Sequence, residues 1–236
     1  MTVAAVILCP SAKGALADTA GRPAVRRMVE TAWAGGATPI VVVAPDPDGF
    51  VAAALAGSPA VLAEPAPESV GPVGQIVRGM RVGADAVTET DAAFIWPGRM
   101  VWVDAETVTT MIEAHGAQRE ALLRPAYEGE PGWPVLLPMT LMDRFETQAA
   151  DLMPDELVDG MLAGGATISL LDLGDPGTTH DLSTAIDDLP PYDGPAEPGA
   201  GPAPEWGAAA ADASDEGPLK GPSLAPYPQA SDSEAD

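Results

Sequence analysis

The chain has 236 residues and a formal net charge of −24, with 35 acidic side chains against 11 basic ones. Proteins bind nucleic-acid backbones through Lys and Arg, so this composition argues against a nucleic-acid partner. A single cysteine, Cys9, excludes an internal disulfide and argues against a cysteine-based zinc site. No stretch reaches the roughly 20 apolar residues of a membrane span, and we expect a cytoplasmic protein without a membrane partner.

The first half of the chain alternates short apolar runs with amphipathic segments. Residues 3–8 are continuously apolar, which is typical of a strand covered on both faces in a parallel sheet. Residues 10–21 are rich in small side chains and predict a loop. From Pro23 to Ala34 the apolar positions repeat at three and four, which predicts a helix with the proline near its first turn. The other elements predicted here are a strand over 40–44, a short helix over 50–55 and a brief strand at 61–62.

The second half continues this alternation. A loop over 64–74 leads to a helix predicted over 75–83, and residues 92–96 form a third central strand. Asp104 stands where the N-cap of the next helix is expected, because its side-chain oxygen can accept a hydrogen bond from the free backbone N–H groups there. The other elements predicted here are strands over 121–125 and 134–137, which could pair, helices over 141–147 and 156–162, and a strand over 168–173.

This order of elements predicts an α/β fold, a three-layer, Rossmann-like, mostly parallel sheet with right-handed crossovers. Ligands of such sheets bind beyond the carboxyl ends of the strands. The segments expected to form a site are therefore 9–21, 64–74, 97–104 and 178–188.

Residues 1–192 are predicted to form this single domain, followed by an acidic tail over 193–236. The tail is dominated by Pro, Ala, Gly, Ser and acids. Such a segment cannot bury enough apolar area to offset the conformational entropy of ordering, and we expect it to be disordered. Trp206 and Tyr227 leave open an alternative, in which the tail is a docking peptide for a protein partner.

Four features together carry a family resemblance. In chain order they are the opening strand with its loop and Gly21-Arg22-Pro23 at a helix start, the segment Gly74–Met80 (GQIVRGM), the strand 92–96 running into Gly98–Asp104, and Gly132–Leu136 (GWPVL) with His180–Thr184 (HDLST). Their order and spacing resemble the MobA-like nucleotidyltransferases. That family includes the guanylyl- and cytidylyltransferases of molybdenum-cofactor synthesis.

The resemblance implies a nucleotide-diphospho-sugar-transferase-like fold and specific ligands. Its substrates would be an NTP and a small phosphorylated acceptor such as molybdopterin, with Mg²⁺ as the metal. Carried over residue by residue, it assigns nucleotide contacts to Leu8, Ser11, Lys13, Gly74 and Gln75. It also assigns catalytic roles to Lys13 and Arg99, and the best surviving metal ligand is Asp181.

The chain departs from the family pattern in the parts that carry the chemistry. The first loop is shorter than the family's, lacks its Gly pair and Arg, and contains Pro10, which removes a backbone donor. Lys13 is then either a phosphate contact or an ordinary surface lysine. Arg99 aligns with the family's metal-binding Asp, and a guanidinium cannot ligate Mg²⁺. Ser183 stands where a second Asp is usual, and Trp133 replaces a His.

These departures leave several interpretations open. Arg99 either neutralises phosphate in place of the metal or pairs with Asp181 or Asp104 in a decayed site. The chain is accordingly a nucleotidyltransferase with a degraded metal site, an inactive pseudoenzyme serving as a binding or assembly module, or a nucleotide-sugar-type transferase. Of the two histidines, His115 is expected to be solvated near a helix end, and His180 is expected at the surface, with a place in the lining of the cleft as the alternative.

Overall fold

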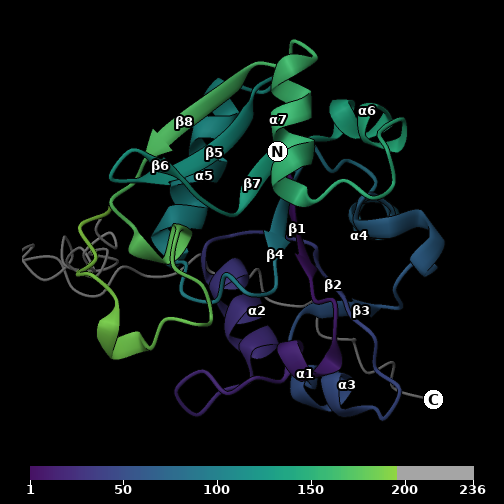
Figure 1. Ribbon diagram of the computed structural model, residues 1–236, viewed down its shortest axis with the longest axis vertical. Coiled ribbons are helices and arrows are strands. Elements are labelled where there is room, and N and C mark those ends of the chain that lie inside the picture. Colours follow the sequence, from purple (N-terminus) through teal and green to yellow (C-terminus); the bar gives the residue numbers. More distant parts are fainter. Residues whose placement is uncertain (196–236) are drawn as a thin grey trace, which may run out of the picture. The chain divides into compact units, whose positions relative to one another are not determined.

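A computed structural model describes residues 1–195 (Figure 1). Most of the predicted tail, with Trp206 and Tyr227, lies outside the described residues, and the domain boundary placed at residue 192 stays a prediction. Within residues 1–195, no helix is long and apolar enough to cross a membrane.

The described residues form one sheet in the order β3-β2-β1-β4-β7-β5-β6, with β8 paired to β5. Strands β1 to β4 are mutually parallel, β8 is parallel to β5, and β7 runs antiparallel between β4 and β5. The strands are β1 (Val3–Leu8), β2 (Ile40–Val43), β3 (Ala60–Ala63), β4 (Ala92–Pro97), β5 (Leu122–Tyr127), β6 (Glu130–Pro131), β7 (Val135–Pro138) and β8 (Ile168–Asp172). The predicted mostly parallel α/β sheet is confirmed, and so is the pairing of the two strands expected at 121–125 and 134–137.

Helices cover both faces of this sheet. On one face α2 contacts α5, and on the other α4 contacts β1 and β2 and is itself contacted by α6 and α7 (Figure 1). The helices are α1 (Ala12–Ala15), α2 (Ala24–Ala34), α3 (Phe50–Leu55), α4 (Gly71–Ala86), α5 (Ala105–Ala117), α6 (Met142–Glu146) and α7 (Pro154–Ala163), with short 3₁₀ turns at Glu68–Val70, Met139–Leu141, Pro176–Thr178 and Ile186–Asp188.

Small residues allow these layers to approach closely. A Cβ at Gly79 of α4 would lie 2.2 Å from Cγ1 of Val6 on β1, so the helix backbone rests directly on the strand. A Cβ at Gly35, at the end of α2, would lie 2.5 Å from Cβ of Val108 on α5. The core combines large side chains such as Trp96 and Phe94 with many Ala and Val residues, whose small size permits these close approaches.

Three local predictions are wrong. The loop expected over 10–21 contains the one-turn helix α1, because the Ser11 hydroxyl accepts a hydrogen bond from the Gly14 N–H and caps it. Helix α4 begins at Gly71 rather than at residue 75. His115 is buried rather than solvated, with 1% of its surface exposed. It continues the inward stripe of Thr107 and Met111 at a spacing of four residues.

Candidate functional site

The carboxyl ends of the central strands meet at one edge of the sheet. The Cys9 N–H donates to the Val43 carbonyl at the end of β2, and the Gly98 N–H donates to the Leu8 carbonyl at the end of β1. A Cβ at Gly98 would lie 2.7 Å from the Cys9 sulfur, so the loops after β1 and β4 are in contact. This edge is where ligands bind in parallel sheets.

A cleft of about 310 Å³ opens at this edge beside the end of β4. It lies between the end of β4, the β5–β6 hairpin, the first turn of α7 and residues 175–184 after β8, which we call the closing segment. Its lining residues are Arg99, Met100, Arg124, Glu130, Pro131, Gly132, Trp133, Asp155, Thr178, Thr179 and Asp181. The volume is at the lower end of the range typical of small-molecule sites.

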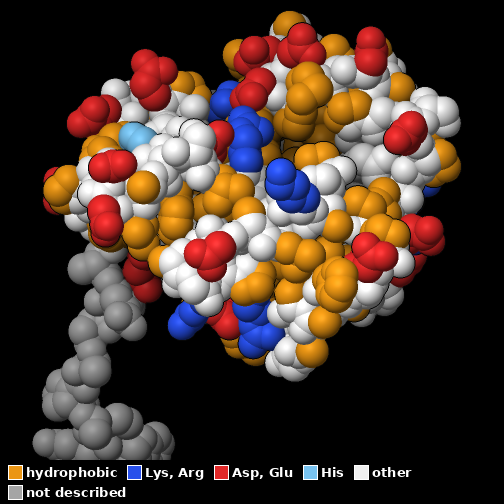
Figure 2. All heavy atoms as spheres, turned by 60° about the horizontal axis from the view of Figure 1, so that its bottom comes forward, with side chains coloured by type: hydrophobic (Ala, Val, Ile, Leu, Met, Phe, Trp, Pro, Cys, Tyr) orange, Lys and Arg blue, Asp and Glu red, His pale blue; other side chains and the backbone are white. Residues whose placement is uncertain are grey.

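Basic side chains gather at this edge although the chain is strongly acidic. Lys13 is on α1, Arg22 precedes α2 and Arg26 and Arg27 lie in its first turn, while Arg99 and Arg124 line the cleft. Figure 2 is turned toward this edge and shows Lys and Arg side chains in the middle of the face, with most Asp and Glu side chains around its rim. An uneven distribution of this kind favours an anionic ligand in the middle of the face.

Arg99 and Asp181 form an ion pair at the mouth of the cleft. Arg99 Nε lies 3.6 Å from Asp181 Oδ2, and half of the arginine side chain is exposed. The other carboxylate oxygen, Oδ1, accepts hydrogen bonds from the Ser183 hydroxyl at 2.6 Å and the Ser183 N–H at 2.9 Å. The Ser183 hydroxyl bond is the main reason that the pKa of Asp181 is lowered, and the charge of Arg99 lowers it further. Asp181 therefore stays ionised beside the guanidinium.

Arg124 is the second guanidinium of the cleft, and it is almost enclosed. Its side chain is 12% exposed; Nε donates to the Gly132 carbonyl at 3.1 Å and Nη2 to Asp155 Oδ1 at 2.9 Å. The guanidinium carbon lies 5.6 Å from the ring centre of Trp133, a cation–π distance. The sequence reading missed Arg124 and Asp155, although an Arg inside the apolar strand LLRPAY was a detectable signal.

The residues predicted to contact the nucleotide lie on the β1 side of this edge. Two of them, Gln75 and Gly74, contact neighbouring residues of the protein itself. The Gln75 amide is held by one residue: its Nε2 donates to the Ala66 carbonyl and its Oε1 accepts from the Ala66 N–H. A Cβ at Gly74 would lie 2.2 Å from Cγ2 of Val70, so this glycine permits close packing of the turn before α4. Leu8 ends β1, Ser11 caps α1 and Lys13 is exposed on α1.

The residues at the cleft do not fit a divalent metal. Mg²⁺ is bound by several oxygen ligands, usually from carboxylates and water. Asp181 has one oxygen occupied by Ser183 and the other facing a guanidinium. Nowhere in residues 1–195 do three or more His, Cys, Asp or Glu side chains come together as a metal site would require. Asp104 is a helix N-cap, with its carboxylate accepting from the Glu106 N–H, as predicted.

The segment that closes the cleft is fixed by residues outside it. The Trp102 indole N–H donates to the carbonyls of Asp181 and Thr184, and the Leu182 N–H donates to the Arg99 carbonyl. His180, predicted at the surface, is half-buried with its Nδ1 2.8 Å from the Pro176 carbonyl. The closing segment thus carries Asp181 on a backbone tied to the end of β4.

The fold and the cleft together define a class of protein, the open α/β sheets whose ligands lie beyond the carboxyl ends of central strands. Residues 12–161 match the MobA-like NTP transferase domain, which is more than half of the chain. The chain belongs to that family, and the resemblance drawn from the four sequence features is confirmed. No curated protein matches the chain.

Solved structures of similar fold include a cytidylyltransferase and a synthetase complexed with CTP. The 2-C-methyl-D-erythritol 4-phosphate cytidylyltransferase from Thermus thermophilus is 17% identical with a TM-score of 0.56, covering 80% of this chain and 96% of that one. CMP:2-keto-3-deoxy-manno-octonic acid synthetase complexed with CTP is 14% identical with a TM-score of 0.58, over 79% of this chain and 93% of that one. Rv0371c from Mycobacterium tuberculosis, complexed with manganese, is 15% identical with a TM-score of 0.57, over 73% and 89%. At these identities the likeness shows the fold alone.

Proposed function

We propose that this domain binds a nucleotide, or another phosphorylated small molecule, through arginine side chains and not through a carboxylate-held Mg²⁺. The observation that carries this proposal is Arg99, a half-exposed guanidinium at the end of the central strand β4. A guanidinium offers several N–H donors in a plane, which suits the oxygens of a phosphate group. In the family pattern this position is an Asp that holds the metal.

The loop after β1 supports binding more readily than transfer. Three N–H groups of this loop are already used: Gly14 donates to the Ser11 hydroxyl, Ala15 to the Ser11 carbonyl and Leu16 to the Ala12 carbonyl. Nucleotidyl transfer depends on backbone N–H groups, cationic side chains and usually a metal to stabilise the charge that moves between phosphates. This chain offers Lys13 and Arg99 as cations, but its described residues hold no group of side chains that could bind a metal. We therefore favour a protein that retains the binding site and has lost metal-dependent transfer.

A second candidate is an active transferase that moves a nucleoside monophosphate from an NTP to a phosphorylated acceptor. Family membership supports it, as does the cleft of about 310 Å³ beside Arg99. Molybdopterin is the acceptor that the sequence resemblance suggests, and a sugar phosphate is the alternative. In this version Arg99 and Lys13 neutralise the phosphates themselves. A tail-mediated role in assembly remains compatible with the binding version.

Isothermal titration of the full chain with CTP, GTP and ATP tests the assignment of Arg99. The Arg99→Ala variant should bind the preferred nucleotide about tenfold or more weakly than the wild type, since a charged hydrogen bond contributes about 1.5–3 kcal/mol. Arg119→Ala, which removes an exposed arginine just after α5 and outside the cleft, is the matched control and should bind as the wild type does. Equal affinity in both variants would remove Arg99 from the site. Release of pyrophosphate from the bound nucleotide on adding an acceptor would favour the transferase instead.

A further inference from the structure

Arg124 has the features of a preorganised anion-binding group that neither the family match nor the sequence assigns. It comes from the middle of β5, a strand whose other residues are apolar or aromatic. Two of its nitrogens are engaged, Nε by the Gly132 carbonyl and Nη2 by Asp155. Within residues 1–195, Nη1 donates to no protein atom, and the side chain lines the cleft. A guanidinium fixed on one side with free N–H groups on the other is suited to an oxyanion.

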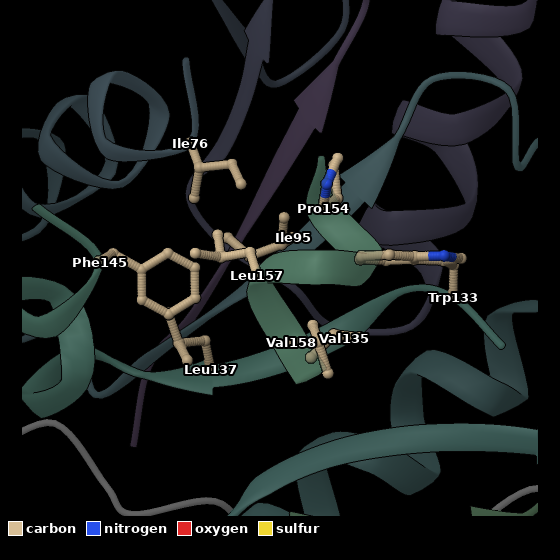
Figure 3. A pocket seen from close by; sticks show the side chains of 9 residues that line it. All are labelled: Ile76, Ile95, Trp133, Val135, Leu137, Phe145, Pro154, Leu157 and Val158. Carbon is tan, nitrogen blue, oxygen red and sulfur yellow. The ribbon is translucent and has the colours of Figure 1, made fainter. Parts of the chain in front are cut away.

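The support behind Arg124 is rigid. Trp133 is 4% exposed, and its indole lies between the guanidinium and an apolar cluster under α7. Figure 3 shows the indole beside Pro154, with Leu157, Val158 and Val135 next to it. The cavity among these side chains is only about 10 Å³, room for one water molecule at most. Trp133 therefore cannot tilt away, and Arg124 keeps its orientation.

The carboxylate of Asp155 is placed so that it can leave. Its side chain is 54% exposed, so water can solvate the carboxylate once its contact with Arg124 is lost. Asp155 also lies in the first turn of α7, where the helix dipole stabilises a negative charge without a partner. Loss of the contact with Arg124 thus leaves Asp155 solvated and still favourably placed. The Gly132 carbonyl and Trp133 continue to hold the guanidinium.

We propose that Arg124 binds the phosphate monoester of a second ligand, and that Asp155 is an internal anion which this phosphate displaces. The inference rests on the proposed function, in which Arg99 binds the nucleotide phosphates. Strand β7 lies between β4 and β5, so Arg124 stands two strand spacings, about 10 Å, from β4 and on the side away from Lys13. That separation gives the acceptor phosphate a site of its own. Arg99 and Asp181 form a similar pair: the arginine lines the cleft, and about a third of the surface of the Asp181 side chain is exposed.

Titration of the full chain with ribose 5-phosphate, a phosphate monoester, and with CTP tests this inference. Asp155→Asn removes the internal anion and should tighten ribose 5-phosphate binding several-fold. Arg124→Gln should weaken it about tenfold or more. The affinity for CTP, whose phosphates Arg99 is proposed to hold, should change by a smaller factor than the affinity for ribose 5-phosphate in both variants. Arg119→Gln removes the same charge outside the cleft and should change neither affinity.

The outcomes separate this site from the proposed function. A purely structural ion pair predicts that Asp155→Asn lowers the melting temperature and leaves ribose 5-phosphate binding unchanged or weaker, and that result overturns the inference. Absence of binding to CTP, GTP and ATP in the wild type overturns the proposed function, whereas the ribose 5-phosphate titrations still decide on Arg124. Absence of ribose 5-phosphate binding in the wild type and in Asp155→Asn also overturns the inference. If Arg124→Gln does not fold, Arg124→Lys keeps the charge without the planar donors and should weaken binding.

Discussion

At the scale of single residues, charged and polar groups of this protein divide between the cleft and the core. Arg99 and Arg124 each meet a carboxylate at the cleft, where solvent can replace the partner. His115 is in the opposite situation. It is buried in α5, and no donor or acceptor lies within hydrogen-bonding distance of its Nδ1 among the described residues. The two environments predict different responses to pH and to substitution.

His115 should make the stability of the protein depend on pH. Burial lowers the pKa of His115, the charge of Asp91 partly opposes this, and Arg119 adds to it. The folded pKa is then below the unfolded value of about 6.5. The contribution is fully present above pH 6.5 and is lost as the pH falls through 6.5 toward the lower folded pKa, because the unfolded state binds the proton first.

Urea unfolding of the wild type and of His115→Leu at pH 7.5 and pH 5.5 measures this effect. The wild type should lose more unfolding free energy between the two pH values than the variant, which lacks the buried imidazole. Equal losses in the two proteins would mean that folding does not change the pKa of His115.

At the scale of elements, a buried carboxylate joins the closing segment to α5. Asp175 is 1% exposed and accepts hydrogen bonds from the Asp104 N–H at 2.9 Å, the Thr107 hydroxyl at 2.7 Å and the Gly177 N–H at 2.8 Å. Burial raises its pKa, and these three bonds oppose that rise. One side chain thereby satisfies free donors at the start of α5 and of the 3₁₀ turn Pro176–Thr178.

Replacement of Asp175 by Ala should destabilise the protein by about 2–4 kcal/mol, since it leaves two buried donors and one partly buried donor without an acceptor. Chemical denaturation measures the change. Asp187→Ala makes the same substitution at an exposed position and should change stability by no more than about 0.5 kcal/mol. A small effect at Asp175, similar to that at Asp187, would show that water replaces the carboxylate.

At the scale of the whole molecule, the repeating pattern of apolar residues predicted the sheet and most helices. The continuous apolar runs of β1, β2 and β4 and the spacing within α2 are local signals that determine burial directly. The carboxylates that pair with the two cleft arginines could not be predicted in the same way. The contacts of Arg124 with Asp155 and of Arg99 with Asp181 join residues far apart in the chain. The burial of His115 follows from the spacing of four residues between Thr107, Met111 and His115 on α5. Its position near the end of the helix suggested exposure to solvent instead.

The central claim is that a guanidinium occupies the place of the metal in a surviving ligand site. Titration of the full chain with CTP in the presence and absence of Mg²⁺ tests this claim most directly. The account predicts binding without Mg²⁺ and no gain in affinity when Mg²⁺ is added. Binding that requires Mg²⁺, or that strengthens about tenfold with it, would contradict the account, as would the absence of binding to CTP, GTP and ATP under both conditions.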